Sequence, residues 1–161
     1  MVFAIIETSM TFFAQQVLES ALQDSIREIR TGQSQTGTPW TATQFRTEIC
    51  DHSFGFFSCT GTNASRLWVK VTPVTSFSAA PNQIQNPVNP ACSMTTLDPA
   101  NDCNWRTAES YDDGTGSSVI IAQAYYKWPT MINLPWFNFA NQAGNNRLLS
   151  AVRVFKNEPF S

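Results

Sequence analysis

The first thirty residues carry a helical pattern of apolar and polar positions. No proline or glycine interrupts the chain before Gly32, which stands where a helix-ending glycine belongs. Apolar residues recur at steps of three and four, as one face of a helix requires: Ala14, Leu18, Leu22, Ile26 and Ile29. Polar residues form the opposite stripe: Gln15, Glu19, Gln23, Arg27 and Arg30. The sequence therefore predicts one long helix over residues 1–32, followed by a second part over residues 33–161.

Residues 2–13 differ from the rest of this helix because they are apolar on most of its circumference. A helix of thirty residues reaches about 45 Å, whereas the remaining chain predicts a radius of gyration near 14 Å, so we expect the helix to overhang the rest of the molecule. Apolar residues interrupted by Glu7, Thr8, Ser9 and Thr11 are too few for a membrane span of about twenty residues. We expect the outer half of a transmembrane helix whose inner half precedes Met1. The alternative is a plain core helix.

If residues 2–13 belong to a membrane span, Glu7 indicates what must surround that span. A carboxylate at membrane depth is costly, so it normally faces protein or a neutralising partner. In a lone span it would need a neighbouring helix, which implies assembly with other subunits.

A second, shorter helix is predicted after a connector over residues 33–41. Thr41 and Gln44 have the spacing of a capping box, and Trp40 and Phe45 have that of a hydrophobic staple. His52 lies in this region, and we interpret it as structural.

Three strands are predicted downstream, over residues 65–74, 118–128 and 147–156, from alternating or continuously apolar patterns. Residues 135–144 are expected to add a turn or two of helix. A long helix followed by a small antiparallel sheet is an α+β arrangement.

The charge balance excludes several functions. The chain contains ten Lys and Arg residues and twelve Asp and Glu residues, and only 14% of it is charged. So few basic residues provide neither a nucleic-acid surface nor a polybasic membrane patch. The single histidine and the absence of any nucleophile–base motif or phosphate loop favour a protein that is not an enzyme, with no cofactor and no metal.

Four cysteines point to an oxidising compartment, since disulfides persist there. They form two pairs that are local in sequence: Cys50 with Cys59, and Cys92 with Cys103. Four cysteines allow three connectivities. We favour the local pairings, because each closes a chain segment that would otherwise be loose; four free buried thiols are the alternative.

Two further groups of residues offer alternative chemistry. Residues 112–116 (Asp-Asp-Gly-Thr-Gly) could offer oxygens to Ca²⁺ but lack the spacing of an EF-hand loop, and a turn before the second strand is favoured. Trp105, Tyr111 and Trp136 fall in expected loops and could form an aromatic platform for glycans. Packing against the sheet is the favoured interpretation of these aromatic residues.

Taken together, the chain resembles the TadE-like minor pilins of tight-adherence type IV pilus systems. The matching segments are Phe3-Ala-Ile-Ile-Glu7, Phe12-Phe13, Gln16-Val-Leu-Glu19 and Arg27-Glu-Ile-Arg-Thr-Gly32, then Ala124-Tyr-Tyr-Lys-Trp-Pro129 and the closing residues 151–160. They cover the two ends of the chain. The basic leader, the processing site and the inner half-span typical of the family have no counterpart in these residues.

The resemblance implies a pilin-like fold with a long N-terminal helix on the sheet and loops pinned by disulfides. It also implies a minor pilin that primes or caps pilus assembly. The implied assembly residues are Phe3, Ile6, Glu7, Met10 and Phe13. The implied partners are a second minor pilin, the major pilin as a further candidate, and the inner membrane. The implied location is the bacterial inner membrane with a periplasmic domain, or the extracellular pilus. The alternative is a secreted or surface-attached adhesin.

Overall fold

The computed structural model describes residues 2–35, 39–57, 66–88, 105–131, 133–134, 137–142 and 144–159. Its elements in chain order are α1 (Val2–Arg30), η1 (Gln33–Gln35), α2 (Ala42–His52), β1 (Leu67–Val74), η3 (Ala80–Gln83), β2 (Ser110–Tyr111), β3 (Val119–Pro129), β4 (Asn133–Leu134), β5 (Phe137–Asn138) and β6 (Asn146–Lys156). The α+β class expected from the sequence is confirmed.

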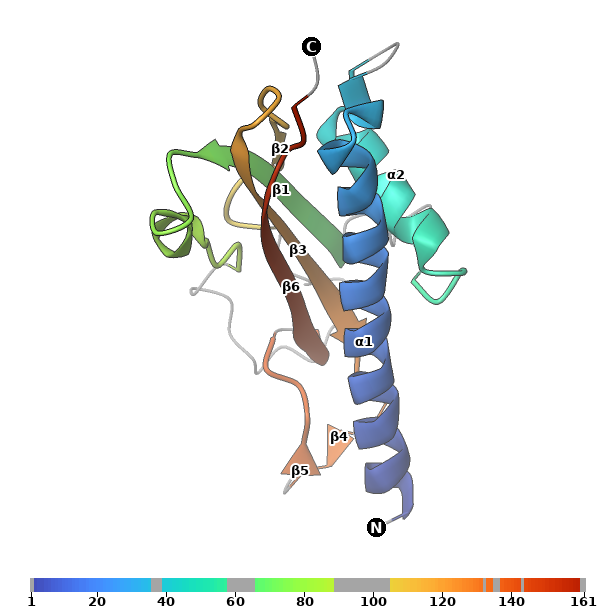
Figure 1. Cartoon of the computed structure of the whole chain (residues 1–161). Helices are drawn as coiled ribbons and strands as arrows, with labels where there is room; N and C mark the ends of the chain where they lie inside the picture. Colours follow the sequence, from blue (N-terminus) through green and yellow to red (C-terminus); the bar gives the residue numbers. More distant parts are fainter. Residues whose placement is uncertain are drawn as a thin grey trace.

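The helix α1 runs along the sheet and continues past it (Figure 1). The second half of α1 is buried along the apolar stripe that the sequence predicts. The helix ends before Gly32, whose φ of 76° lies in the left-handed region that glycine adopts without strain. The expected single helix and its overhang are therefore both present.

The helix α2 begins with the predicted capping box. The Thr41 side chain accepts a hydrogen bond from the Gln44 backbone N–H at 3.3 Å, and the Gln44 side chain accepts one from the Thr41 N–H at 2.8 Å. Trp40 lies beside Phe45, with ring centroids 6.4 Å apart. These contacts fix where the chain turns into α2 and place Phe45 in the core.

The principal sheet has the strand order β2-β1-β3-β6. β1 pairs with β3, and β3 pairs with β6, both antiparallel. β2 pairs with β1 in parallel, through Lys70–Ser110 and Val71–Tyr111. The sheet is therefore mixed, which corrects the expectation of an antiparallel sheet. The two residues of β2 are too few to produce a periodic pattern in the sequence.

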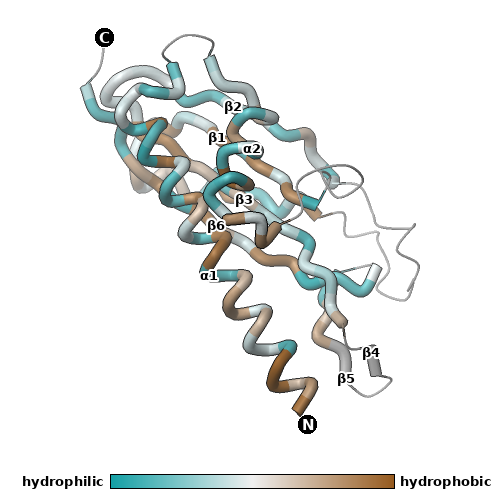
Figure 2. Tube along the Cα trace, turned by 90° about the vertical axis from the view of Figure 1, so that its right-hand side faces the viewer, coloured by the Kyte–Doolittle hydropathy of each residue, from teal (hydrophilic) through white to brown (hydrophobic). Residues whose placement is uncertain are grey.

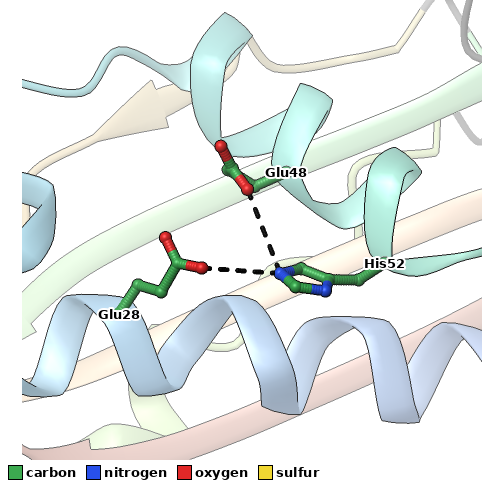
Figure 3. Close-up of side chains that lie close together, drawn as sticks. All are labelled: Glu28, Glu48 and His52. Atoms are coloured by element: carbon green, nitrogen blue, oxygen red, sulfur yellow. Dashed lines mark ion pairs between the residues drawn. The ribbon is translucent and has the colours of Figure 1, made fainter.

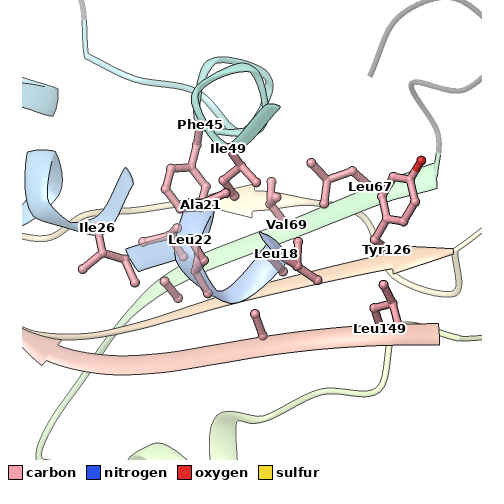
Figure 4. Packing of buried hydrophobic residues seen from close by; sticks show 14 of the residues in the cluster. Leu18, Ala21, Leu22, Ile26, Phe45, Ile49, Leu67, Val69, Tyr126 and Leu149 are labelled. Carbon is pink, nitrogen blue, oxygen red and sulfur yellow. The ribbon is translucent and has the colours of Figure 1, made fainter. Parts of the chain in front are cut away.

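One face of this sheet packs against α1 and α2 (Figure 4). The buried cluster combines side chains from both helices with alternate residues of the strands. Its labelled members are Leu18, Ala21, Leu22, Ile26, Phe45, Ile49, Leu67, Val69, Tyr126 and Leu149. The second half of α1 thus belongs to the same core as the sheet.

The segments before and after residues 89–104 contact the opposite face. Gln123 of β3 is fully buried there, and its side chain accepts from the Gln85 N–H at 3.0 Å and donates to the Gln83 carbonyl at 3.0 Å. The Trp68 indole N–H donates to the Thr107 carbonyl at 2.9 Å. β3 is consequently buried on both faces, as its apolar sequence predicts.

The region after β3 differs from the expectation. Residues 133–134 and 137–138 form the two short antiparallel strands β4 and β5, and Gln142 bridges to Asn146. The helix expected over residues 135–144 is therefore wrong for the described part of that range. Asparagine and glycine are poor helix formers, and this stretch contains Asn138, Asn141 and Gly144.

Among the described helices, none combines the length and the apolar character that a membrane crossing needs.

Candidate functional site

The first half of α1 exposes an unusual amount of apolar side chain. Seven large apolar residues there are between 36% and 76% exposed: Val2, Phe3, Ile5, Ile6, Met10, Phe12 and Phe13. At about 100° per residue they occupy roughly half of the helix circumference. We call these seven residues the apolar face. Figure 2 shows this hydrophobic end of α1 projecting from the rest of the chain.

The hydroxyl groups in this segment bond to the helix itself. Thr8 donates to the Ala4 carbonyl at 2.8 Å, Ser9 to the Ile5 carbonyl at 2.8 Å, and Thr11 to the Glu7 carbonyl at 2.9 Å. Each of these donors is satisfied within the helix, so burying the apolar face against an apolar partner would leave no hydroxyl donor unpaired.

Glu7 lies on the other side of the helix. It is only 2% exposed, and its Oε1 accepts a hydrogen bond from the backbone N–H of Met131 at 2.9 Å. Met131 follows β3, so this bond joins the projecting half of α1 to the chain that leads toward β4. The contact spans 124 sequence positions, and no sequence pattern could have identified Met131.

An aromatic cluster supports the apolar face where it meets the sheet. Phe13 meets Phe56 edge-to-face, with ring centroids 5.1 Å apart. Phe56 stacks on Trp128 at 5.3 Å, and Phe57 contacts Tyr126 at 4.5 Å. Such ring pairs add stability beyond their buried area. Phe13 thus has one side in this cluster while remaining 55% exposed.

Polar contacts fix the second half of α1 on β6. The Gln15 side chain donates to the Ser150 carbonyl at 2.7 Å and accepts from the Ser150 N–H at 3.4 Å. The Arg153 guanidinium donates to the Glu19 carboxylate at 3.0 Å. The bonds from Gln15 and Arg153 hold the pKa of Glu19 below its ordinary value. The direction in which the apolar face projects is therefore set by the core and by these bonds.

Four of the five predicted assembly residues belong to the apolar face: Phe3, Ile6, Met10 and Phe13. Glu7 is separated from them and contacts its own chain. The structure thus brings together the apolar members of the predicted set and turns the acidic member inward.

Residues 112–116 form a turn before β3, as favoured from the sequence. The Asp112 side chain accepts from the Gly114 N–H at 3.0 Å, and Gly114 has a φ of 63°. Asp113 accepts from the Ser34 hydroxyl at 2.7 Å and from the Tyr111 hydroxyl at 3.2 Å. Burial, reinforced by these acidic neighbours, raises the pKa of Tyr111 well above its ordinary value.

Trp105 and Tyr111 do not share one platform. Tyr111 packs with Trp40 and Phe45, at centroid distances of 6.4 and 5.6 Å. Trp105 lies 6.4 Å from Trp68, which faces the other side of the sheet, and carries the Lys127 ammonium 4.5 Å above its ring. Trp136 lies outside the described residues.

A cleft of about 430 Å³ adjoins Trp105. It is lined by Arg46, Leu67, Trp68, Trp105, Thr107, Ala108 and Glu109. Glu109 pairs with Arg46 at 3.0 Å and accepts from the backbone N–H of Val69 at 3.2 Å. Burial raises the pKa of Glu109, although Arg46 opposes that shift.

Cys50 is disulfide-bonded. Cys59, Cys92 and Cys103 lie outside the described residues, so the local pairings remain predictions.

His52 lies at the end of α2 against two carboxylates (Figure 3). Its Nε2 is 3.6 Å from Oε1 of Glu28 on α1 and 3.9 Å from Oε2 of Glu48 on α2. The spacing of Glu48 and His52 is visible in the sequence as an i, i+4 pair. Glu28 comes from another helix and gives no such signal.

Compared with known proteins, the chain matches no family model, no curated protein and no solved structure.

Proposed function

We propose that this protein is a non-enzymatic assembly subunit of the minor-pilin kind, which binds other helical subunits through the apolar face of α1. The observation that carries the proposal is the exposure of seven large apolar side chains on the projecting half of a helix whose other half is firmly seated in the core. Exposed apolar patches of this kind mark interaction surfaces.

The energetics of burying the apolar face favour a helical partner. Burying a large apolar side chain completely contributes about 1.5 to 3 kcal/mol, so the partial burial of seven such side chains can offset the cost of association. An apolar surface over roughly half of a helix suits packing among several helices, whereas a single groove would cover a narrower stripe. The self-bonded hydroxyls of Thr8, Ser9 and Thr11 are compatible with such burial.

The location that the pilin resemblance implies, the inner membrane with an exported domain or the pilus itself, belongs to this proposal. The disulfide at Cys50 supports an oxidising compartment for the domain. The apolar face suits acyl chains as well as apolar helices, so the same surface could serve a subunit before and after assembly.

A matched pair of double variants tests the proposed surface. Ile6→Glu with Met10→Glu places two charges, four residues apart, on the apolar face. Gln16→Glu with Ser20→Glu places two charges at the same spacing on exposed positions beyond that face. In cells that assemble pili with this subunit, we expect the first variant to lower the number of pili per cell and the second to leave it unchanged.

Protein level and thermal unfolding provide the controls for this experiment. Because Ile6 and Met10 lie outside the buried core, both variants should accumulate and unfold like the wild type. Normal piliation by the Ile6→Glu, Met10→Glu protein would refute the proposed function, and equal loss in both variants would show that the apolar face has no special role.

The cleft beside Trp105 favours a second candidate function, a surface-attached module that binds a glycan. A tryptophan ring can stack on a sugar ring, and the half-buried Glu109 carboxylate beside it can accept hydrogen bonds from the sugar hydroxyl groups. Under this hypothesis Trp105→Ala abolishes binding on a glycan array while the circular dichroism spectrum stays unchanged. Wild-type protein that binds no glycan would eliminate this candidate.

A further inference from the structure

The contact between α1 and α2 contains three metal-ligating side chains that the proposed assembly function does not use. Glu28 comes from the last turn of α1, whereas Glu48 and His52 come from one face of α2. Each offers one ligand atom, and the three atoms lie within 4.8 Å of one another. Figure 3 shows the three side chains converging between the two helices.

We propose that Glu28, Glu48 and His52 form a binding site for a divalent transition-metal ion of the Zn²⁺ type, which links α1 to α2. Four ligands at zinc distances of 2.0 to 2.2 Å lie about 3.3 to 3.6 Å apart in a tetrahedron. The His52–Glu28 separation of 3.6 Å falls in this range, and the His52–Glu48 separation of 3.9 Å exceeds it by about 0.3 Å. The three ligand atoms all lie within 4.8 Å of one another, so side-chain rotations that bring the two carboxylate oxygens closer together complete the site.

The imidazole nitrogen supplies an independent reason. His52 Nε2 is buried from solvent and makes no hydrogen bond in the described part of the chain, although it faces two carboxylate oxygens. Its distances to those oxygens are too long for hydrogen bonds. A cation between the three atoms would satisfy the nitrogen lone pair and both carboxylates together.

The local charge favours a cation. Two carboxylates meet one imidazole, and Asp51 adds a further negative charge near Glu48. Glu28 and His52 lie in the last turns of their helices, where the helix dipole also attracts positive charge. The two arginines in the same turn of α1 lie elsewhere: Arg27 and Arg30 line a groove against β6, and Arg30 pairs with Glu158 at 3.6 Å.

The donor set selects the class of ion. Ca²⁺ and Mg²⁺ prefer sites made of oxygen ligands alone, whereas an imidazole nitrogen with two carboxylates suits Zn²⁺ and its first-row neighbours. Three protein ligands leave a fourth position for water. Since the three side chains are about one-third exposed, an ion can enter from solvent.

Titration of the metal-free chain with ZnCl₂ tests the site by calorimetry and thermal unfolding. We expect one Zn²⁺ per chain, and a rise in the unfolding midpoint of about 5 to 10 °C at a hundredfold excess of metal over its Kd. MgCl₂ should produce no comparable rise. Absence of zinc binding by the wild-type chain would overturn the proposal.

Variants assign the binding to these residues. Glu28→Gln and His52→Gln keep side-chain size near the original and should each weaken Zn²⁺ binding by at least about tenfold. Glu158→Gln removes an exposed carboxylate elsewhere and should bind like the wild type. Circular dichroism without metal shows whether each variant is folded. Undiminished zinc binding by folded Glu28→Gln and His52→Gln proteins would overturn the proposal, because the ion would then occupy another site.

Binding of Co²⁺ gives a second measurement that does not depend on stability. A tetrahedral site with one imidazole produces intense visible absorption on Co²⁺ binding, and Zn²⁺ should displace the cobalt and remove that absorption. Metal binding can be measured independently of pilus assembly, because all three proposed ligands belong to a single chain.

Discussion

The carboxylate of Glu7 is almost fully buried and accepts a hydrogen bond from the backbone N–H of Met131. Replacing the Glu7 carboxylate can therefore remove a negative charge, a hydrogen-bond acceptor, or both. The bond is part-buried, since Glu7 is 2% exposed and Met131 is 73% exposed, so water can partly replace a lost acceptor.

Glu7→Leu should lower the free energy of unfolding by about 1 kcal/mol, because it removes the acceptor of the part-buried bond from the Met131 N–H. Glu7→Gln keeps a side-chain oxygen and should lower it less. Urea unfolding of both variants measures the difference. A leucine variant as stable as the glutamine variant would mean that the bond to Met131 contributes nothing.

Glu19 makes the docking of α1 on β6 sensitive to acid. Its pKa is lowered by the bonds from Gln15 and Arg153, so the folded state binds fewer protons than the unfolded state near the ordinary value of 4.5. This stabilisation is therefore present above that value and is lost as pH falls through the lowered pKa.

We accordingly expect the wild type to lose more stability between pH 6 and pH 3 than Glu19→Gln does. Arg153→Met should reduce the pH dependence in the same way, because it removes one of the two donors. Urea midpoints at the two pH values provide the measurement. Parallel pH profiles for all three proteins would contradict the assignment to Glu19.

At the level of single elements, the capping box is the clearest local determinant. Thr41→Ala removes the acceptor for the Gln44 N–H and should cost about 1 kcal/mol of folding free energy. Thr43→Ala, at an exposed position inside α2, is the matched control and should be close to neutral. If both variants unfold at the same urea concentration, the cap does not determine the stability of α2.

The elements that the sequence predicts well are those with long periodic patterns. The stripe from Ala14 to Ile29 identifies α1, alternation identifies β1 and β6, and a continuous apolar run identifies β3, because burial imposes these patterns on the sequence. β2, β4 and β5 contain two residues each, so they carry no period. Their pairing depends on tertiary contacts.

Only part of the candidate site could be predicted from the sequence. Exposure of Phe3, Ile6, Met10 and Phe13 follows from an apolar segment that extends beyond the core. The inward contact of Glu7 does not follow, because its partner lies 124 positions away. The meeting of Glu28 with His52 likewise depends on how two helices pack, which local spacing does not encode.

At the level of the whole molecule, the disulfide at Cys50 links α2 covalently to another cysteine. The local pairing predicts a Cys50–Cys59 bond. Proteolysis without reduction, followed by mass spectrometry, should recover the peptides containing these two cysteines as one linked species. Recovery of Cys50 linked to Cys92 or Cys103 would replace the local pairing with a long-range one.

The division of α1 into a seated half and a projecting half separates folding from association (Figure 1). The seated half shares its core with β1, β3 and β6, whereas the apolar face contributes little to that core. Substitutions on the apolar face should therefore alter association more than stability, which makes the matched variants at residues 6, 10, 16 and 20 informative.

The bonds between Gln15 and Ser150 have a consequence for how the sheet meets other chains. β6 lies at the edge of the sheet, and an open edge strand invites a foreign strand to add to it and start aggregation. The Gln15 amide engages both backbone groups of Ser150, as the backbone of an added strand would. A subunit that is rich in exposed apolar surface at one end thus blocks the middle of its sheet edge with its own helix, which disfavours fibrous growth by strand addition.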